Sequence, residues 1–340
     1  MKYALDVLVT LLLIAFMSAA SAAQPFNPGA HAIDIPEWFK PSFLDFREDI
    51  AEATKNRKRM MAYFGQDGCP YCRELMRVNF SQKDIVDKTR RHFDVVAVNI
   101  WGDLDVTWLD RKRYSEKSFA ALFKVQFTPT VLFFDEQGNV VLRLNGYYPP
   151  HKFAAALDYV AGRHEMRSTF AEYLAQYARE AASGRLHEEP FLMRPPHDFA
   201  RARKGGRPLA VLFEQKDCAA CDELHRTGFK DKQVSALIGK FDVARLELFG
   251  QTSLVTPSGK RSTEAGWAQN LNVSYTPSMV FFDEQGREVF RIEGYLRPFH
   301  LASGFDYVAS GAYRKEPSFQ RYVQARAKKI TDKGGHVKLW

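Results

Sequence analysis

Residues 60–72 read Met-Met-Ala-Tyr-Phe-Gly-Gln-Asp-Gly-Cys-Pro-Tyr-Cys, a short apolar run that leads into a pair of cysteines, Cys69 and Cys72. The apolar run lies between a basic cluster and a glycine, and this pattern predicts a buried strand. Residues 69–80 predict a helix, because Pro70 then falls in the first turn, where its missing amide proton does no harm. The sequence therefore places a cysteine pair at the start of a helix that directly follows a strand.

The same pattern occurs again later, so the chain is one unit written twice. Residues 133–138, Phe-Phe-Asp-Glu-Gln-Gly, recur letter for letter as residues 281–286, at an offset of 148 (281 minus 133). A second cysteine pair, Cys218 and Cys221, follows the first at an offset of 149 (218 minus 69). Two long copies of this kind suit two domains and exclude a solenoid of short repeats.

The first copy predicts the order β, α, β, α, β, β, α behind a leading helix, in which Phe43, Phe46, Ile50 and Ala53 fall at helical spacing. Two strands joined by a helix run parallel, whereas a hairpin is antiparallel, so we expect a mixed sheet covered by helices on both faces. The fold class is therefore α/β. The expected strands are 60–64, 95–100, 130–134 and 139–144, the helices are 69–80, 81–93, 115–124, 150–162 and 168–182, and an inserted loop spans 101–114.

The chain of 340 residues is predicted to have six segments: a signal peptide 1–23, an N-terminal extension 24–42, a first domain 43–165, a helical linker 166–206, a second domain 207–325 and a loose C-terminal tail 326–340. Lys2, the apolar run from Val7 to Met17 and the small residues before Gln24 indicate a cleaved leader. An uncleaved membrane anchor is the alternative, but the run is shorter than the roughly 20 residues that a spanning helix needs. We therefore expect a periplasmic or otherwise exported protein.

The net charge of +8 at pH 7 is compatible with acidic partners or an anionic membrane surface. The lysines and arginines are scattered, however, and they form no basic stripe with interleaved aromatic residues. An ordinary solvated surface is favoured, and no binding of nucleic acid is expected.

All four cysteines of the chain belong to the two Cys-x-x-Cys pairs. A cysteine at a helix start lies beside unpaired amide groups and the positive end of the helix dipole, which favour the thiolate. The thiolate is the attacking species in disulfide exchange, so Cys69 and Cys218 are the predicted nucleophiles. Cys72 and Cys221 follow one helical turn later, close enough to resolve a mixed disulfide.

Other uses of the pairs are disfavoured by their spacing. A structural bond between Cys69 and Cys72 would close a very short loop, which the chain-entropy estimate values at ~1.9 kcal/mol against ~3 kcal/mol for fifteen residues. The pairs lie 149 positions apart (218 minus 69), far more than the roughly 15 to 20 residues of a zinc ribbon. Covalent haem needs a histidine after the second cysteine, where Arg73 and Asp222 stand. No metal and no cofactor are expected.

A cysteine pair between a strand and a helix, with a later Thr-Pro before a hairpin, strongly resembles the thioredoxin superfamily. The match covers about 43–163 and 208–313. The resemblance implies two tandem thioredoxin-like domains in which the proline is cis and packs beside the cysteines, so that Thr128, Pro129, Thr276 and Pro277 dock the substrate. The first pair has the dipeptide of glutaredoxins, and the inserted loop is similar to that of SoxW-like periplasmic thioredoxins and of the C-terminal domain of the transmembrane reductant conductor.

The sequence departs from that family around the cysteines. Thioredoxins carry a buried acid six residues before the first cysteine, where this chain has Tyr63 and Leu212. Asp67 and Asp217 would raise the pKa of a nearby thiol. His225 lies four residues after the second pair and could tune its thiols, although a surface histidine without such a role is favoured.

The sequence thus predicts an exported thiol:disulfide oxidoreductase that reduces or exchanges disulfides with its two sites. Protein disulfides are the expected substrates, and a membrane thiol-electron conductor is the expected source of electrons. Two alternatives stay open. One is a disulfide isomerase or oxidase whose two sites grip a misfolded protein, and the other is a binding or assembly module in which one pair is structural.

Overall fold

The computed structural model describes residues 35–177, 182–202 and 206–337. The predicted signal peptide and most of the predicted extension therefore lie outside the described residues. Within the described ranges, no helix is long and apolar enough to cross a membrane.

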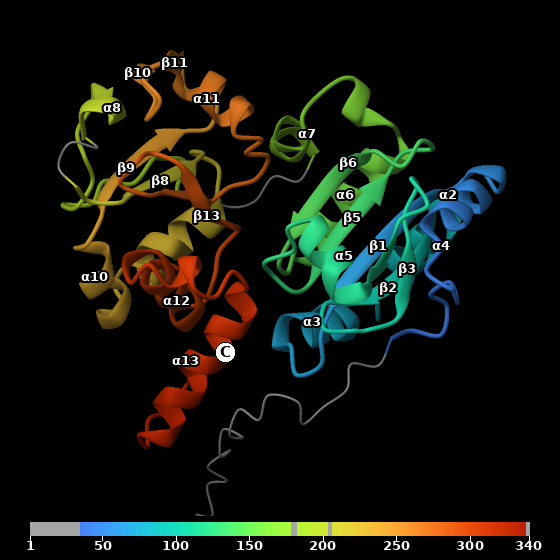
Figure 1. The fold of residues 1–340 in the computed structure, drawn as a ribbon. Helices are drawn as coiled ribbons and strands as arrows, with labels where there is room; N and C mark the ends of the chain where they lie inside the picture. Colours follow the sequence, from blue (N-terminus) through green and yellow to red (C-terminus); the bar gives the residue numbers. More distant parts are fainter. Residues whose placement is uncertain (1–34, 178–181, 203–205, 338–340) are drawn as a thin grey trace, which may run out of the picture.

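The first domain is built on a four-stranded sheet in the order β2-β1-β5-β6 (Figure 1). Strands β1 and β2 are parallel, whereas β5 is antiparallel to both β1 and β6. The sheet is therefore mixed, as predicted. The strands are β1 (Arg59–Gly65), β2 (Phe93–Asn99), β5 (Thr130–Phe134) and β6 (Val140–Asn145), and the helices are α2 (Phe46–Lys55), α3 (Pro70–Glu74), α4 (Lys83–His92), α5 (Glu116–Leu122), α6 (Pro150–Ala161) and α7 (Phe170–Tyr177).

Helices cover both faces of this sheet, which explains why every residue of β1 is buried. Side chains alternate between the faces along the strand. Met61 and Tyr63 pack in one core layer with residues of α4 and α6, and Met60 and Phe64 pack in the other with residues of α2 and α5.

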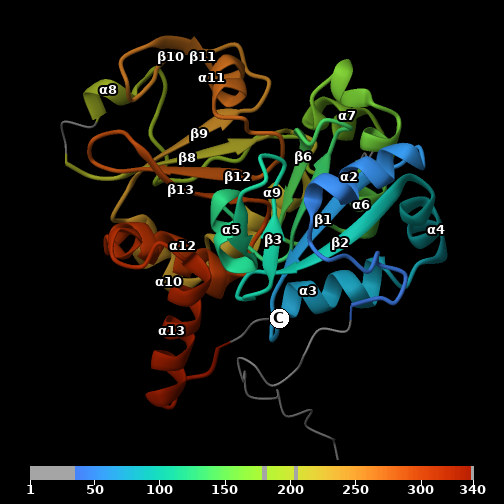
Figure 2. The same ribbon diagram turned by 45° about the vertical axis from the view of Figure 1, so that its right-hand side comes forward.

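The second domain repeats this topology with the strand order β13-β12-β8-β9. Figure 2 shows its sheet between two layers of helices, with α8 and α11 above it and α10 and α12 below. The predicted fold class is thus confirmed for both copies. The strands are β8 (Leu209–Glu214), β9 (Asp242–Glu247), β12 (Ser278–Phe282) and β13 (Glu288–Glu293), and the helices are α8 (Phe199–Ala202), α9 (Ala219–Glu223), α10 (Lys232–Ile238), α11 (Glu264–Asn270), α12 (Pro298–Ala309) and α13 (Phe319–Asp332).

Several local predictions differ from the structure. The leading helix starts at Phe46, because the Asp45 side chain caps it by accepting from the Glu48 amide, and Phe43 is fully exposed instead of buried. The predicted loop 101–114 contains a hairpin of β3 (Asp105–Thr107) and β4 (Arg113–Ser115), and the second copy has the matching pair β10 (Ser253–Val255) and β11 (Arg261–Thr263).

The predicted linker and tail are also more ordered than expected. The segment after residue 182 forms strand β7 (His197–Asp198), which pairs with β10, and then α8. Helix α13 continues to Asp332, and Ala327 within the predicted tail is buried. The tail prediction is therefore wrong as far as Asp332, because the apolar side of this helix packs on the second domain. The predicted segment boundaries themselves stay a prediction.

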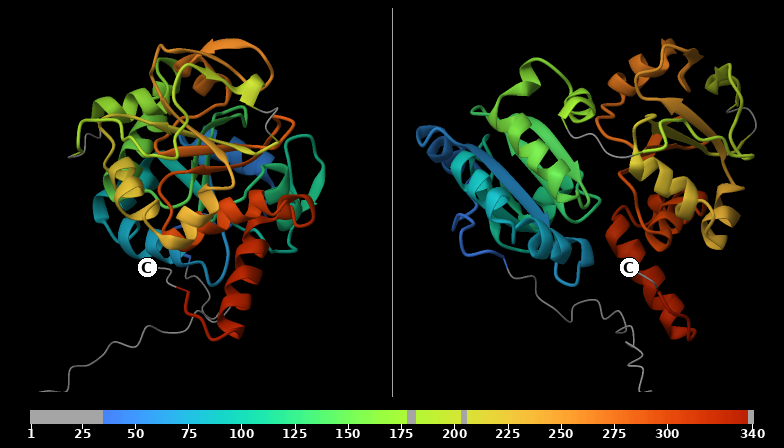
Figure 3. Two further views of the ribbon diagram at one scale, coloured as in Figure 1. Left: turned by 90° about the vertical axis from the view of Figure 1, so that its left-hand side faces the viewer. Right: turned by 180° about the vertical axis from the view of Figure 1, so that it is seen from behind.

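The two domains lie side by side with separate sheets (Figure 3) and pack through equivalent surfaces. Phe127 lies in the core of the second domain, with its ring 5.7 Å from that of Phe290 and 5.4 Å from that of Phe319. Its counterpart in the second copy, Tyr275, lies in the core of the first domain, 4.5 Å from the ring of Tyr148.

One contact joins a repeat position to its own counterpart. The Asn145 side-chain amide donates to the Glu293 carboxylate, and these residues are separated by the repeat offset of 148 (293 minus 145). An interface in which the same patch is used on both sides is the arrangement of an isologous dimer. Here both halves of that arrangement belong to one chain.

Phe127→Ala should therefore destabilise the second domain, although the residue belongs to the first copy. Removal of a buried phenylalanine ring costs about 3 to 5 kcal/mol, and the lost contacts lie against Phe290 and Phe319. Hydrogen exchange followed by mass spectrometry should show faster exchange in β13 and α13. Phe119→Ala, in the first domain's own core, is the matched control and should speed exchange in the first domain. Faster exchange confined to the first domain in both variants would contradict the exchanged packing.

Candidate active sites

Each cysteine pair lies between the first strand of its sheet and the helix that follows. Cys69 caps α3, and its Sγ accepts a hydrogen bond from the Cys72 backbone amide at 3.0 Å. Cys218 caps α9 in the same way, with 3.1 Å between its Sγ and the Cys221 amide nitrogen. An amide donor and the positive end of a helix both favour negative charge on the first sulfur of each pair.

Both pairs are closed as disulfides in the structure. The Cα atoms are 5.3 Å apart for Cys69 and Cys72 and 5.2 Å apart for Cys218 and Cys221. These separations lie within the range that a disulfide requires. The second cysteine of each pair is therefore placed to bond to the first without movement of the backbone.

The two Thr-Pro dipeptides lie beside the cysteines. The Thr128–Pro129 and Thr276–Pro277 bonds are both cis. The carbonyl oxygen of Thr128 is 3.3 Å from Cys69 Sγ, and Thr276 lines the same cavity as Cys218. The structure thus brings Thr128 and Thr276, the first residue of each predicted docking pair, to the cysteine pair of its own domain.

The first site faces a cavity of about 300 Å³ that is completed by the second domain. Gln66 links the two sides, because its side-chain amide donates to Thr128 Oγ1 and to Gln320 Oε1, at 3.0 Å each. Cys69 is only 4% exposed beneath this cover. From the first domain the lining includes Asp67, Cys69, Pro70, Tyr71, Phe127 and Thr128, and from the second it includes Tyr295, Arg297, His300, Gln320 and Val323.

The second site is covered by the first domain in the corresponding way. Cys218 is 2% exposed and faces a cavity of about 250 Å³. Helices α6 and α7 supply Lys152, Ala171 and Leu174 to its wall. Each cysteine pair therefore faces the domain interface.

The two sites differ in the strand that precedes the cysteines. In the first domain, the buried Tyr63 hydroxyl fills the space over Gly65, where any Cβ would collide with it, and burial raises the pKa of this hydroxyl. In the second domain the corresponding residues are Leu212 and Glu214, and Glu214 is fully buried. The second site thus has a buried acid four residues before its first cysteine, although the position six residues before it holds Leu212.

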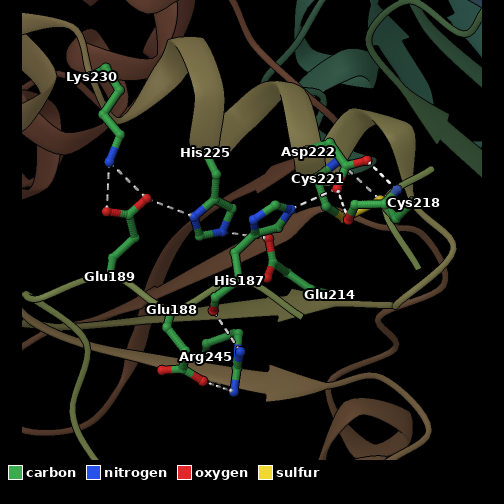
Figure 4. A network of polar contacts seen from close by, with 11 residues as sticks. His187, Glu188, Glu189, Glu214, Cys218, Cys221, Asp222, His225, Lys230 and Arg245 are labelled. Atoms are coloured by element: carbon green, nitrogen blue, oxygen red, sulfur yellow. Dashed lines mark hydrogen bonds and ion pairs between the residues drawn. A yellow bond between two sulfur atoms is a disulfide. The ribbon is translucent and has the colours of Figure 1, made fainter. Parts of the chain in front are cut away.

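Glu214 belongs to a network of polar contacts behind the second pair (Figure 4). His225 Nε2 is 2.9 Å from Glu214 Oε1, and His225 Nδ1 is 3.1 Å from Glu189 Oε1. Burial opposes ionisation of Glu189, but hydrogen bonds from Lys230 and His225 lower the pKa of its carboxyl. His225 is buried, so the prediction of a surface histidine is wrong.

The network reaches the cysteines through His187 and Asp222. The His187 ring stacks on the His225 ring with 4.4 Å between centroids, and His187 Nε2 is 2.6 Å from Asp222 Oδ1. Asp222 directly follows Cys221. Burial again opposes ionisation, but hydrogen bonds from Ser183 and His187 hold the pKa of the Asp222 carboxyl below its usual value. Sequence reasoning missed these partners, because a polar connector with Pro and Gly gives no signal of packing behind an active site.

Among the residues that the structure describes, no group of three His, Cys, Asp or Glu side chains is arranged to hold a metal ion.

Comparison with known proteins adds the family. The model of the thioredoxin-like domain matches residues 46–161 and again residues 195–309, which together make up well over half of the chain. The chain belongs to the thioredoxin-like domain family. Over 113 residues it is 27% identical to the thiol:disulfide interchange protein DsbD of Pseudoalteromonas atlantica. That match covers 33% of this chain and only 17% of the length of the relative.

Solved structures give similar partial matches. A thioredoxin-fold protein from Helicobacter pylori is 27% identical, with coverage of 39% of this chain and 90% of that protein at a TM-score of 0.31. The C-terminal domain of Neisseria meningitidis DsbD in its reduced form is 11% identical, with coverage of 32% and 88% at a TM-score of 0.26.

Substitution of His225, the histidine that contacts Glu214, should destabilise the second domain. His225→Met leaves the buried Glu214 carboxylate without its hydrogen bond, and a buried polar group that loses its partner costs about 1 to 3 kcal/mol or more. Glu214 Oε2 already has no hydrogen-bond partner among the described residues. Urea unfolding should show the lower stability.

A triple variant provides the matched control for His225→Met. Leu212→Tyr, Glu214→Gly and His225→Met together introduce Tyr, Gly and Met, the residues of the first copy at positions 63, 65 and 76. This variant removes the unpaired carboxylate and should regain stability relative to His225→Met alone. Equal stability of His225→Met and the parent protein would show that the Glu214 contact contributes nothing.

Proposed function

We propose that this protein is an exported thiol:disulfide oxidoreductase that reduces or exchanges protein disulfides at two sites. The observation that carries the proposal is the repeated geometry of Cys69 and Cys218. Each sulfur caps a helix, accepts a backbone amide hydrogen bond and is closed in a disulfide with the next cysteine of its pair. The Pseudoalteromonas atlantica relative is named a thiol:disulfide interchange protein, which supports the same chemistry.

The reaction at the first site begins with the reduced pair. The Cys69 thiolate attacks one sulfur of a substrate disulfide, a mixed disulfide forms and the other substrate sulfur leaves as a thiolate. Cys72 then loses its proton to solvent and attacks Cys69 Sγ, which closes the pair and releases the second substrate thiolate. Both substrate sulfurs take up protons from solvent. Two electrons have passed from the pair to the substrate, and Cys218 and Cys221 carry out the same steps in the second domain.

The Thr-Pro loops are the proposed docking positions for the substrate. The Thr128 carbonyl oxygen lies 3.3 Å from Cys69 Sγ, so a peptide that runs along this loop would bring its own sulfur close to the nucleophile. The Pro129 and Pro277 carbonyl oxygens are held by amides of Gly146 and Gly294, at 2.7 Å each. These bonds hold each Thr-Pro loop on its own sheet. Thr128 and Thr276 then line the cavities at the two cysteine pairs. Thr128, Pro129, Thr276 and Pro277 are thus proposed to dock the substrate.

Access of a protein substrate requires the domains to separate. Cys69 and Cys218 are 4% and 2% exposed, and each is covered by helices of the other domain. The leader pattern in residues 1–23 supports export, and a pair that has been oxidised by its substrate must be reduced again before it can react a second time. We therefore propose a membrane thiol-electron conductor as the donor.

The full chain should reduce insulin disulfides with dithiothreitol as the donor. Substitution of Cys69 and Cys218 together by serine should abolish this turnover, because no attacking sulfur is left. Cys72→Ser and Cys221→Ser should each accumulate a mixed disulfide with insulin, visible as a mass increase that a reductant reverses. The double variant Cys69→Ser with Cys72→Ser is the control for the first domain. A parent chain without turnover, together with serine variants that trap nothing, would rule out the proposed enzyme.

The reduction potential of each pair separates the reductase from the alternative oxidase or isomerase. Each 30 mV corresponds to about 1.4 kcal/mol for this two-electron couple. Potentials near −270 mV, as in thioredoxin, would support reduction, and values near −120 mV, as in DsbA, would support oxidation.

A further inference from the structure

A basic side chain of the opposite domain lines the cavity at each cysteine pair. His300, on α12 of the second domain, lines the cavity of Cys69. Lys152, on α6 of the first domain, lines the cavity of Cys218. The two residues occupy the same position of the repeat, at the offset of 148 (300 minus 152). The interface therefore places one basic side chain from each copy at the site of the other.

His300 lies against the residue between the first two cysteines. Its ring centroid is 5.2 Å from that of Tyr71. Its Nδ1 is buried and has no hydrogen-bond partner among the described residues. Burial, with a smaller contribution from the Arg326 charge, lowers the pKa of His300 to about 4. While the pair is a disulfide, this imidazole is neutral and has a ring nitrogen available.

Lys152 lies against the residue before the second Thr-Pro dipeptide. Its buried Nζ donates to the Tyr275 hydroxyl at 3.2 Å and lies 5.0 Å from the centre of the Tyr275 ring. Tyr275 and Thr276 line the same cavity as Cys218. An ammonium group thus stands at the wall of the second site.

The other charged and titratable groups around the pairs are largely acidic. Negative charge close to a thiol raises its pKa and disfavours the thiolate. A nearby cation or base opposes this effect, so it has a large influence on how much of the cysteine is ionised. Around Cys69 these groups are Asp67, Tyr71, Glu74, Tyr147, Glu293, Tyr295 and Arg297, with Arg326 beyond His300, and around Cys218 they are Lys216, Asp217, Glu247 and Tyr275, with Asp222 and its network behind the pair.

We propose that His300 and Lys152 set the charge state of the cysteine pair in the opposite domain, His300 at Cys69 and Lys152 at Cys218. The inference rests on the proposed function, since it concerns the reduced pairs. When the first pair is reduced, the Cys69 thiol loses its proton and the His300 imidazole takes it up, which leaves a thiolate and an imidazolium facing the same cavity. At the second site, Lys152 favours the Cys218 thiolate by its charge alone. Both are positioning residues, and each domain completes the site of the other.

Alkylation of the reduced, full-length chain tests this inference. The rate of reaction with iodoacetamide is measured across pH, and mass spectrometry of the peptides reports Cys69 and Cys218 separately. His300→Phe keeps a ring against Tyr71 but removes both nitrogens, and Lys152→Met keeps an apolar chain but removes the charge. An opposite charge that faces a thiol across a cavity lowers its pKa, by up to about 1 to 3 units where the separation is about 4 to 6 Å. His300→Phe should therefore raise the midpoint of Cys69 by about one pH unit and leave the midpoint of Cys218 unchanged. Lys152→Met should raise the midpoint of Cys218 by a similar amount and leave the midpoint of Cys69 unchanged.

The control variants are His151→Phe and Lys240→Met, whose side chains are exposed and line neither cavity. Neither should shift a midpoint. If His300→Phe and Lys152→Met only loosen the interface, the limiting rates at high pH rise for both thiols while both midpoints stay fixed, and the inference is overturned. Midpoints that move in the substituted residue's own domain would also overturn it.

The alkylation test is independent of turnover. It uses the reduced thiols and no disulfide substrate, so a chain that fails to reduce insulin can still show the cross-domain shifts. Conversely, turnover of insulin with unchanged midpoints would leave the proposed function in place and refute the roles of His300 and Lys152.

Discussion

Phe127 and Tyr275, each buried in the core of the opposite domain, connect the chemistry of this protein to its domain interface. The next residue in each case is the threonine of a cis Thr-Pro dipeptide, and Thr128 touches Cys69 through its carbonyl oxygen. A single loop in each copy therefore packs into the neighbouring domain, lies beside its own cysteine pair and starts the central hairpin. Movement of one domain away from the other must withdraw these aromatic rings, so the environment of the sulfurs changes with the interface.

The two copies share a topology but differ beneath their cysteines. In the first, Tyr63 and Gly65 form a compact pair in which a buried hydroxyl occupies the space above the glycine. In the second, the same space is taken by Glu214 and its histidine partner, and the contacts extend to Asp222 beside the second cysteine. A buried carboxylate is costly unless it is paired, which is why the second copy also needs the residues of segment 183–189. The sites therefore differ in local charge, and equal thiol chemistry in both is not expected.

Much of the fold could be predicted from the sequence because the repeat fixes the pattern twice. The apolar runs before the cysteines, the hairpins around 135–138 and 283–286 and the Thr-Pro dipeptides each have local signals, and all lie where those signals place them. Glu214 was missed because a charged residue at the end of an apolar strand usually indicates that the strand reaches solvent there. The contacts of Phe127 with Phe319 and of Lys152 with Tyr275 were missed for a different reason. A repeat offset identifies equivalent positions, but it carries no information on which surfaces of the two copies meet.

The same surfaces that face the sulfurs also form the domain interface, so a protein substrate of the proposed enzyme would compete with the other half of the chain. Because the two domains share one chain, their association does not depend on protein concentration. The apparent affinity of each site for a protein disulfide is then its intrinsic affinity multiplied by the fraction of molecules in which the domains are apart. The contacts at Phe127, Tyr275 and the pair Asn145 and Glu293 set that fraction. Under the proposed function, a substrate that docks on one Thr-Pro loop would displace the opposite domain and so uncover the second cysteine pair as well, which would make the two sites accessible together.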